Sequence, residues 1–557
     1  MSLNLESTVN VGLRLSEIAR TDPDGVAVVE PLKRKRRGNR RYRQVSFREL
    51  DEDTDRIAAG LRELGVQAGM RLVVLVPPGI DFVALVFALF KAGAVIVLID
   101  PGMGRSNLLD CLEECEPEGF VAVPKAHAAR AVMRRRFRGA KINITVGRRI
   151  FWGGTTLASL RRAAVGGFQQ ARTGARDPAA VIFTSGSTGP PKGVLYLHGN
   201  FDQQVDQIRD RYGIEPGEID LPGFPLFALF NAAMGVTTVF PDMDFSRPAQ
   251  ADPRNIIEAA TDWKVTQAFG SPALWNVVGR YCQDHGMHLP TLRRVLSAGA
   301  PVPPHVLERM KSVIHPDGDV HTPYGATEAL PIASTSASEV INETAKLSGQ
   351  GAGTCVGQRF SGIDWKVIRI RDDPIEHIDA IEELPSGEIG ELIVRGPVVT
   401  PRYVTCLEAN RLHKIQDGED VWHRMGDVGY LDRSDRFWFC GRKSQRVLHT
   451  RGILYTVPVE SIINQHPHVY RSALVGYGPK GRQIAVLVVE AWPEFRPDSR
   501  RQKEQLIAEL WDIVKSQKFA HEIRDILLHP SLPVDVRHNS KIFREQLAEW
   551  ARQERAI

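Results

Sequence analysis

A short apolar run, residues 179–183, leads directly into a loop that is rich in glycine and hydroxyl side chains. Glycines let a backbone approach a ligand closely, and successive N–H groups can form a concave anion site. Hydroxyl groups donate hydrogen bonds to phosphate oxygens, and a lysine adds positive charge. The pattern therefore predicts a buried strand that ends in a phosphate-binding loop, made of Thr184, Ser185, Gly186, Ser187, Thr188, Gly189 and Lys192.

The spacing of this loop differs from that of the P-loop NTPases. Lys192 follows two prolines, and no hydroxyl residue comes directly after it. A flexible Ser/Gly linker is the alternative interpretation. A linker, however, need not follow an apolar strand or contain Pro-Pro-Lys-Gly.

Strand-like and helix-like segments alternate over the first three hundred residues. Strands are expected over 72–76, 95–99, 119–123, 265–269 and 294–297, and helices over 82–92, 108–116, 126–138 and 200–211. This alternation is typical of α/β layers with largely parallel sheets. Ligands of such sheets bind at the carboxyl ends of strands. We therefore expect the glycine loop, residues 298–301 and residues 323–328 to converge on one site.

The length of the chain and the change in its expected secondary structure predict two domains. A chain of 557 residues is too long for a single core. It becomes strand-rich after about residue 353, and a smaller unit begins after Gly441. We expect an α/β fold with a large domain over 1–441, built of layered α/β sheets plus a β-rich subdomain, and a small mobile α+β domain over 442–557.

Basic residues are concentrated locally although the net charge is only +5. One run covers 33–43, from Lys33 to Arg43, and another covers 134–138. Strand-like segments flank the first run, which predicts the tip of a solvated β-hairpin. Docking to a membrane surface or to a partner enzyme of the same pathway is the alternative for this hairpin. Nucleic acid is not expected, because no aromatic stacking platform accompanies the charges.

Cysteine usage and the N-terminal sequence indicate a cytoplasmic protein. The six cysteines are scattered, without paired metal-ligand spacing, so neither a disulfide framework nor a structural zinc site is expected. The first residues lack the basic and apolar regions of a secretion signal. The most apolar stretch, residues 82–99, contains Lys91 and Gly93 and is interpreted as a buried helix–strand unit rather than a membrane span.

The glycine loop resembles the signature loop of the adenylate-forming superfamily, which includes acyl-CoA synthetases, luciferases and nonribosomal peptide adenylation domains. Further stretches match this superfamily in the same order, so the resemblance covers residues 82–544. They are Ala-Gly-Ala-Pro at 298–301, Tyr-Gly-Ala-Thr-Glu at 324–328, Trp-His-Arg-Met-Gly-Asp-Val-Gly at 422–429, Gly-Arg at 441–442 and Asn-Ser-Lys-Ile-Phe-Arg at 539–544. Two positions depart from the superfamily pattern: Met425 stands where Thr or Ser is usual, and Ser540 stands where Gly is usual.

The resemblance implies an enzyme that uses ATP and Mg²⁺ to form an acyl-adenylate. The glycine loop is expected to contact the nucleotide. Gly299, Ala300 and Pro301 are expected at the adenine, and Tyr324, Gly325, Ala326 and Thr327 at the adenine and α-phosphate. Asp427 and Arg442 are expected at the ribose. Glu328 is the expected metal ligand. The expected catalytic residues are Thr184, Lys192, Glu328 and Lys541, of which Lys541 bridges the substrate carboxylate and the α-phosphate.

Two departures point to one branch of the superfamily. Ala228 replaces a histidine that helps to gate the acyl pocket, and residues 443–447 lack the usual acidic hinge residue. With residues 186–201 and 539–544, they make the chain similar to the β-lactone synthetases of bacterial long-chain olefin biosynthesis. That branch activates a 2-alkyl-3-hydroxy fatty acid as its adenylate, and the 3-hydroxyl then closes a β-lactone with release of AMP. No thiol acceptor is then needed, and the small domain is expected to hold one pose.

Three other functions stay open from the sequence. The first is a long-chain acyl-CoA or acyl-AMP ligase, and the second is a binding or scaffold protein that has kept the fold without the chemistry. A basic nucleic-acid binder is the third and the least favoured. Apolar residues over 224–230 and 232–239 are expected either to line an acyl pocket or to belong to the ordinary core. His198 is interpreted as a structural histidine rather than as a proton acceptor.

Overall fold

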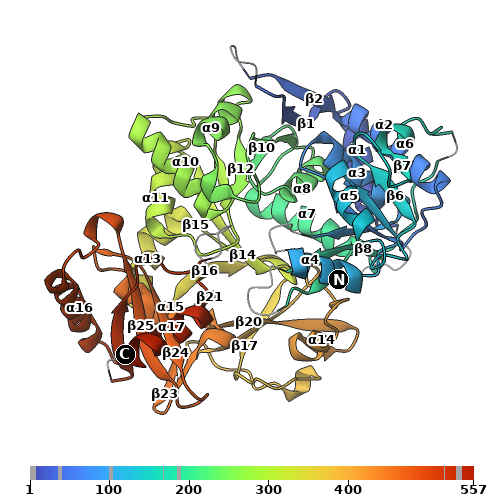
Figure 1. Ribbon diagram of the computed structural model, residues 1–557. Coiled ribbons are helices and arrows are strands. Elements are labelled where there is room, and N and C mark those ends of the chain that lie inside the picture. Colours follow the sequence, from blue (N-terminus) through green and yellow to red (C-terminus); the bar gives the residue numbers. More distant parts are fainter. Residues whose placement is uncertain are drawn as a thin grey trace.

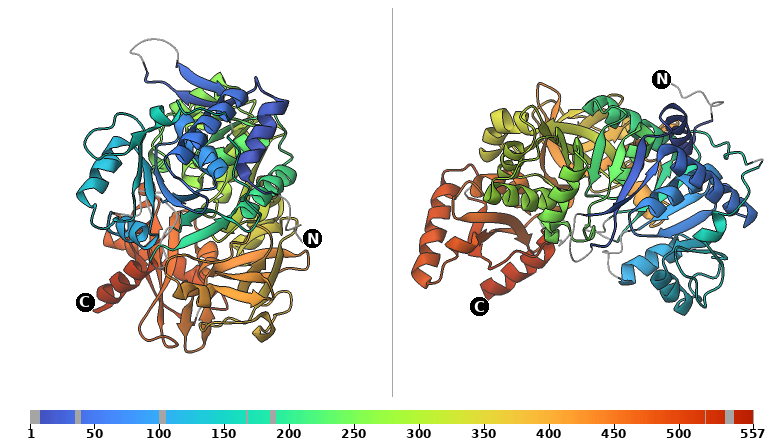
Figure 2. Two further views of the ribbon diagram at one scale, coloured as in Figure 1. Left: turned by 90° about the vertical axis from the view of Figure 1, so that its right-hand side faces the viewer. Right: turned by 90° about the horizontal axis from the view of Figure 1, so that it is seen from above.

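The computed structural model contains two large sheets and a separate C-terminal unit (Figures 1 and 2). The structure describes residues 8–34, 40–99, 105–166, 168–184, 190–519, 521–534 and 542–556. The α/β fold class predicted from the sequence is confirmed. None of the described helices combines the length and the hydrophobicity that crossing a bilayer requires.

The seven-stranded sheet is parallel except for its last pair. Its strand order is β7 (Thr155–Thr156), β6 (Ile142–Thr145), β5 (Gly119–Ala122), β3 (Arg71–Leu75), β4 (Val95–Leu98), β8 (Pro178–Phe183) and β9 (Gly193–Leu197). Strand β8 is parallel to β4 and antiparallel to β9. The glycine loop is therefore the connection between two adjacent antiparallel strands. Helices α2 (Phe47–Glu63), α3 (Ile80–Ala92), α4 (Arg105–Glu114), α5 (Pro124–Val132) and α6 (Leu157–Leu160) belong to the same part of the chain.

The fourteen-stranded sheet joins the second α/β layer to the β-rich part in one hydrogen-bonded surface. Its parallel half runs β1 (Val26–Pro31), β11 (Thr237–Val239), β10 (Ile219–Pro222), β12 (Gln267–Gly270), β13 (Arg294–Ser297) and β14 (Asp319–Ala326), with β2 (Tyr42–Ser46) at the edge. Its antiparallel half continues through β15 (Ala329–Ser336), β16 (Thr354–Arg359), β21 (Arg436–Arg442), β20 (Asp420–Leu431), β18 (Gly390–Arg395) and β17 (Asp364–Ile368). Strand β19 (Lys414–Asp417) pairs with β20.

Helices cover both large sheets and pack into two main apolar cores. They include α1 (Val11–Thr21), α7 (His198–Tyr212), α8 (Phe227–Met234), α9 (Pro253–Asp262), α10 (Pro272–His285) and α11 (Pro304–Val313). The main apolar cluster takes residues from α3, α7 and α8 and from strands of both sheets. Every residue of α3 except Asp81 is buried, including Lys91, whose Nζ lies 2.6 Å from carboxylate oxygens of Asp51 and Asp55. The apolar stretch is therefore a buried helix–strand unit, as predicted.

The C-terminal unit has its own sheets and cores. It contains β22 (Val447–His449) with β23 (Gly452–Leu454), then β24 (Val469–Tyr477), β25 (Ile484–Ala491) and β26 (Ile523–Leu528). Helices α15 (Thr456–Ile463), α16 (Arg500–Lys515) and α17 (Arg544–Ala556) pack on these strands. Figure 1 shows this unit in orange to red, at the lower left of the large body. The domain division at 441/442 stays a prediction.

Strand β21 leads into the C-terminal unit at a glycine that the local packing requires. Gly441 has a φ of +134°, and a Cβ atom there would lie 2.4 Å from Oγ1 of Thr456. Three cations of the C-terminal unit and of the segment that enters it pair with acids of the preceding part of the chain. Lys443 pairs with buried Glu391 at 2.9 Å, and Arg446 and Lys480 pair with Asp372 at 2.9 and 2.5 Å. Together these ion pairs hold the C-terminal unit on the large body in this pose.

The basic hairpin predicted over 33–43 is formed by antiparallel β1 and β2. Its tip, residues 35–39, lies outside the described residues. The expectation of a freely solvated hairpin is only partly right. Arg40 is 8% exposed and lies 2.8 Å from Asp242, and Arg34 lies 2.9 Å from Glu258. Asp242 precedes α9 and Glu258 lies within it, so part of the basic charge is neutralised within the molecule.

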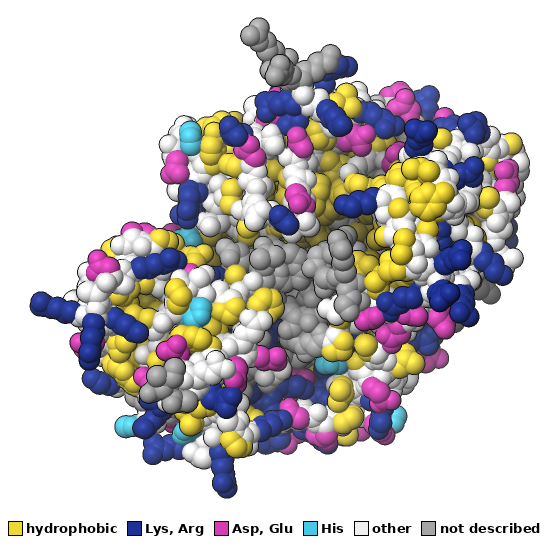
Figure 3. All heavy atoms as spheres, in the orientation of Figure 1, with side chains coloured by type: hydrophobic (Ala, Val, Ile, Leu, Met, Phe, Trp, Pro, Cys, Tyr) yellow, Lys and Arg dark blue, Asp and Glu magenta, His cyan; other side chains and the backbone are white. Residues whose placement is uncertain are grey.

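Charges of both signs are interspersed over the face drawn in Figure 3. The six cysteines are all free, in agreement with the sequence analysis. One element is shorter than predicted. Helix α5 ends at Val132 rather than at residue 138, because Phe137 turns inward and packs edge-on against Phe120 at 5.1 Å.

Candidate functional site

Most of the predicted site segments that the structure describes lie at strand ends or in the turns that follow them. The glycine loop follows β8, residues 298–301 follow β13, and Thr327 and Glu328 form the turn between β14 and β15. Asp427 lies on β20 and Arg442 ends β21, where the two residues are Cα partners in the ladder. The glycine loop belongs to the seven-stranded sheet and the other segments to the fourteen-stranded sheet, so contacts between the two sheets are needed to bring them together.

The glycine loop closes at its base through its first and last expected ligands. The amide of Thr184 donates to the carbonyl of Lys192, and the amide of Lys192 donates to Oγ1 of Thr184, both at 3.0 Å. The base is also attached to the β-rich part, because the amide of Gly193 donates to Oγ1 of Thr405 at 2.7 Å. Ser185, Gly186, Ser187, Thr188 and Gly189 lie outside the described residues.

Tyr324, Asp427 and Arg442 form the first cluster of predicted ligands. The Tyr324 hydroxyl donates to Oδ2 of Asp427 at 2.5 Å, and an Arg442 nitrogen lies 2.8 Å from Oδ1 as an ion pair. The Asp427 side chain is 3% exposed. Burial raises the pKa of this carboxyl, and the Arg442 charge opposes that shift.

One oxygen of this carboxylate has capacity left for a ligand. Among the described residues, none makes a hydrogen bond of good geometry to Oδ1 of Asp427. A buried acceptor without a hydrogen bond carries a cost that a ligand hydroxyl can remove. The arrangement therefore suits a ligand that donates a hydrogen bond to this oxygen, as a sugar hydroxyl does.

Lys192 and Glu328 form a second cluster around the ring of Tyr403. The Tyr403 hydroxyl donates to Oε1 of Glu328 at 2.7 Å, and Nζ of Lys192 lies 5.5 Å from the ring centroid. Tyr403 is 1% exposed, so its ring cannot move freely. A single buried ring thus holds the expected metal ligand and lies against the expected phosphate-binding lysine.

The turn that carries Glu328 is held from both sides by hydrogen bonds to its backbone. The Tyr196 hydroxyl donates to the carbonyl of Thr327 at 2.6 Å. The amide and the hydroxyl of Thr400 both donate to the carbonyl of Glu328, at 2.9 and 2.8 Å. These contacts orient the Glu328 carboxylate without using its side-chain oxygens.

Lys414 lies beneath this cluster as a buried lysine. Its Nζ donates to the carbonyl of Thr400 at 2.5 Å and lies 5.8 Å from the centroid of the Tyr403 ring. Its side chain forms no ion pair with any acid among the described residues. Burial lowers the pKa of Lys414 to about 7, and the nearby Glu328 charge offsets part of that shift.

The predicted adenine-binding residues lie in the turn after β13. Gly299 has a φ of +94° in the turn after β13, and Ala298 donates to the carbonyl of Gly270 at 3.1 Å. Residues 299–301 make no hydrogen bond to the other predicted ligands that the structure describes. Their adenine contact stays a prediction.

Lys541 lies outside the described residues, but the ends of its segment are held together. Val534 and Ile542 form an antiparallel bridge, and the amide of Phe543 donates to the carbonyl of Pro533 at 2.9 Å. Arg544 of the same motif is an anchor, because it pairs with Glu460 at 2.5 Å. The role of Lys541 stays a prediction.

His198 is buried in the core at the start of α7. Its ring packs edge-on against Phe90 at 5.7 Å, and burial lowers its pKa to about 4. This environment agrees with the structural role that the sequence analysis favours. Ala228 is fully buried in α8, and Phe227 stacks on Phe269 at 4.4 Å.

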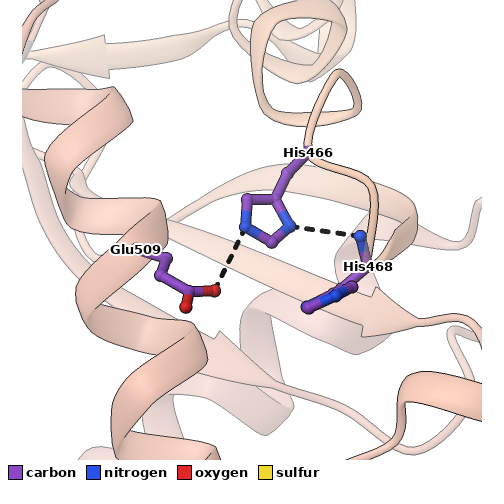
Figure 4. A group of neighbouring side chains, drawn as sticks. All are labelled: His466, His468 and Glu509. Atoms are coloured by element: carbon purple, nitrogen blue, oxygen red, sulfur yellow. Dashed lines mark hydrogen bonds and ion pairs between the residues drawn. The ribbon is translucent and has the colours of Figure 1, made fainter.

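His466, His468 and Glu509 gather in the C-terminal unit, as Figure 4 shows. Nε2 of His466 lies 3.3 Å from Glu509, while Nδ1 accepts the backbone amide of His468 at 3.2 Å. Neutral His466 must therefore carry its proton on Nε2. A metal on Nε2 would displace that proton, and one on Nδ1 would break the bond to the amide. We assign this group a structural role rather than a metal.

Sequence reasoning missed Tyr403, Thr400 and Lys414. They lie in a segment between two recognised motifs, and none of them belongs to a motif that the sequence analysis identified. The only available signal was a tyrosine and a lysine in a stretch that the sequence predicted as β-rich. Their role becomes visible only when β19 pairs with β20 and brings Lys414 beneath Glu328.

Comparison with known proteins identifies a full-length match. The family model described as AMP-binding enzyme matches residues 15–404. The olefin beta-lactone synthetase of Stenotrophomonas maltophilia is 46% identical, over 97% of this chain and 98% of its own length. That of Xanthomonas campestris pv. campestris is 45% identical, over 98% of both chains. Among solved structures, ATP-bound MatB from Rhodopseudomonas palustris has a TM-score of 0.76 at 19% identity, over 98% of this chain and 99% of that chain.

The lowered pKa of Lys414 predicts a pH dependence of stability. A lysine that binds its proton more weakly in the folded than in the unfolded protein destabilises the fold when charged. That penalty is full below about pH 7 and is lost as the pH rises toward the unfolded pKa of about 10.5. Relative to Lys414→Met, the wild-type free energy of unfolding should therefore rise between about pH 7 and about pH 10.

Denaturant unfolding at several pH values checks this prediction. Lys515→Met, which removes a lysine with a 69% exposed side chain from α16, is the matched control and should follow the wild type across the range. Parallel curves for the wild type and Lys414→Met would contradict the assigned burial of the charge.

Proposed function

Because this chain belongs to the AMP-binding enzyme family, and within it to the olefin beta-lactone synthetases, we propose that it converts a long-chain 2-alkyl-3-hydroxy fatty acid into a β-lactone with consumption of ATP. The observation that carries this function is the identity of about 46% to the first relative over nearly the whole of both chains. Since the reaction consumes ATP, we propose the cytoplasm as its location.

The first step forms an acyl-adenylate. A carboxylate oxygen attacks the α-phosphorus of ATP, and the bond to the bridging oxygen of the β-phosphate breaks, which releases pyrophosphate. The protein need supply no nucleophile, so catalysis rests on positioning and charge neutralisation. We assign phosphate contacts to Thr184, Lys192 and the glycine loop between them, and the bridge between carboxylate and α-phosphate to Lys541.

The nucleoside is assigned to the first cluster. The unsatisfied Oδ1 of Asp427 suits a ribose hydroxyl, and Arg442 lies beside it. Tyr324 holds the other carboxylate oxygen and presents its ring next to this point. Residues 299–301 would complete the adenine side of the pocket.

Glu328 fits the role of a Mg²⁺ ligand. Its Oε1 accepts the Tyr403 hydroxyl, and no described residue donates a hydrogen bond to its Oε2. A carboxylate oxygen next to a phosphate site is the donor that Mg²⁺ usually takes from a protein. When bound, Mg²⁺ would neutralise phosphate charge, and Tyr403 and Thr400 would keep the Glu328 carboxylate aimed at it.

The second step closes the ring. The 3-hydroxyl oxygen attacks the acyl carbon, the bond from that carbon to the AMP oxygen breaks, and the hydroxyl proton is released. An internal nucleophile gains an effective molarity of about 10⁵ M or more, although ring strain offsets part of this gain. No thiol has to reach the adenylate.

The hinge supports a reaction without a thiol. Residues 443–447 lack the acidic hinge residue that is usual in the superfamily, and the first of them, Lys443, has its Nζ 2.9 Å from Glu391. Glu391 is fully buried and also pairs with Arg424 at 2.6 Å. Rotation of the small unit would break the Lys443 pair at a buried acid, which favours a single pose.

An acyl-CoA or acyl-AMP ligase is the alternative, and the product distinguishes it. Purified protein given ATP, Mg²⁺ and a 2-alkyl-3-hydroxy fatty acid should yield AMP, pyrophosphate and the β-lactone without added thiol, as read by mass spectrometry. The matched control is the same acid without its 3-hydroxyl, which should give no lactone. A strict requirement for CoA, with a thioester as product, would contradict the ring closure and leave adenylation intact.

Replacement of Asp427 tests the assigned nucleotide pocket. In Asp427→Asn the charged acceptor for the ribose is lost, so ATP binding should weaken by about 10- to 100-fold, since hydrogen bonds to charged groups contribute about 1.5–3 kcal/mol. Titration calorimetry with Mg·ATP measures the effect. Asp432→Asn, which changes a neighbouring acid paired with Arg436, is the control and should bind ATP normally. Wild-type affinity in Asp427→Asn would exclude this carboxylate from the pocket.

A further inference from the structure

The chain carries its positive charge very unevenly. From Gly119 to Arg176 there are thirteen Lys and Arg residues and no Asp or Glu. The whole chain has a net charge of only +5, so the remainder of the chain is net negative. A segment of 58 residues with one sign of charge produces a local field that the overall composition hides.

This segment builds one edge of the seven-stranded sheet. It contributes β5, α5, β6, β7 and α6, and the strand order places β7, β6 and β5 at the end opposite β9. Figure 2 shows the segment in cyan, at the periphery of the molecule and away from the C-terminal unit. This part of the chain therefore lies at the surface of the molecule.

Some of these cations are neutralised internally. Arg136 pairs with Asp110, Arg161 with Asp53 and Asp81, and Arg176 with Glu419. A second group is exposed and has no acidic partner among the described residues. Its members are Arg134, Arg135, Arg138, Arg148 and Arg149.

Large apolar side chains project from the same edge. Val132 is 85% exposed, Phe151 72% and Ile150 64%, and they are three of the four most exposed large apolar residues that the structure describes. Such residues are costly in water, and their concentration next to arginines that have no acidic partner among the described residues is not explained by the internal fold.

The turn that carries Ile150 and Phe151 is anchored to α5. Trp152 stacks on His127 of α5 at 5.9 Å, and its Nε1 donates to Oγ1 of Thr145 at 2.9 Å. Phe151 packs edge-on against Trp152 at 5.2 Å. The turn is thus held close to the helix that ends at Val132, and the apolar and basic groups share one edge.

We propose that this basic–apolar edge, defined by Val132, Arg134, Arg135 and Arg148 to Phe151, docks on a membrane surface that contains anionic lipid. Arginines attract the lipid phosphates and acidic headgroups, while the apolar side chains enter the interfacial layer. Nucleic acid could bind the arginines, but it provides no apolar surface that would bury the aliphatic side chains of Val132 and Ile150. Docking needs no catalysis, so it holds or fails independently of the lactone chemistry.

Vesicle flotation of the full-length protein tests the proposal. The protein should float with vesicles that contain phosphatidylglycerol, and much less with phosphatidylcholine alone. Each neutralised arginine at an anionic surface changes binding by about fivefold, so the double variant Arg148→Glu and Arg149→Glu should lower the partition coefficient by about 20-fold or more. The double variant Ile150→Ser and Phe151→Ser should also weaken binding, with the charge unchanged.

Matched variants elsewhere separate this edge from general charge and hydrophobicity. Lys33→Glu with Arg41→Glu makes the same charge change in the basic hairpin, and Leu407→Ser removes an apolar residue that is 65% exposed. Both should bind vesicles within about twofold of the wild type, and thermal melts show that every variant is folded.

Three outcomes would overturn the proposal. They are failure of the wild type to bind anionic vesicles, an equal loss of binding in the hairpin variant, and binding that survives the Ile150 and Phe151 replacements unchanged. Tight, salt-dependent binding of DNA or of an acidic protein in place of vesicles would assign the edge to a different partner.

Discussion

The carboxylate of Asp427 is the point on which the candidate site depends. It lies almost fully buried between the Tyr324 hydroxyl and the Arg442 guanidinium, on three strands of one sheet. A buried charge is stable only when it is paired and hydrogen-bonded. Tyr324 lies four residues before Glu328, the proposed metal ligand, and Arg442 precedes the C-terminal unit, so this carboxylate connects the proposed nucleotide pocket to both segments.

A second buried acid has a related function at the hinge. Glu391 holds Arg424 of its own sheet and Lys443 of the segment that enters the C-terminal unit. Asp372 adds pairs to Arg446 and Lys480. The same unit carries the segment of Lys541, whose ends are joined by the bridge between Val534 and Ile542. A small unit held in this way suits a reaction in which activation and ring closure use one arrangement of the protein.

Local patterns were sufficient to predict much of the architecture. The apolar runs before the glycine loop and before residues 298–301 are strands, and each ends where a polar motif begins. The continuity of the fourteen-stranded sheet could not be predicted, because the pairing of β15 with β16 and of β16 with β21 is set by tertiary contacts rather than by local preference. Likewise, the pairing of Arg40 with Asp242 joins residues about two hundred positions apart.

Some residues of the candidate site could be predicted from the sequence, and others could be found only in the structure. Motif residues such as Asp427 and Arg442 could be named from the sequence, because each belongs to a short, recognisable run. Tyr403 and Lys414 could not, because a lone tyrosine or lysine indicates nothing until the fold places it against Glu328. The basic–apolar edge could be predicted from the sequence only in part. Its charge is evident in the sequence, but the exposure of Val132 and Phe151 requires the structure.

The proposed mechanism requires that ATP activates the carboxyl group and not the 3-hydroxyl. A 2-alkyl-3-hydroxy fatty acid labelled with oxygen-18 at both carboxyl oxygens tests this requirement, with mass spectrometry of AMP and lactone after one turnover. We expect one labelled oxygen in AMP and one in the lactone carbonyl, with an unlabelled ring oxygen from the hydroxyl. A lactone that retains both labelled oxygens, beside unlabelled AMP, would mean that the hydroxyl was the activated group and would contradict the mechanism.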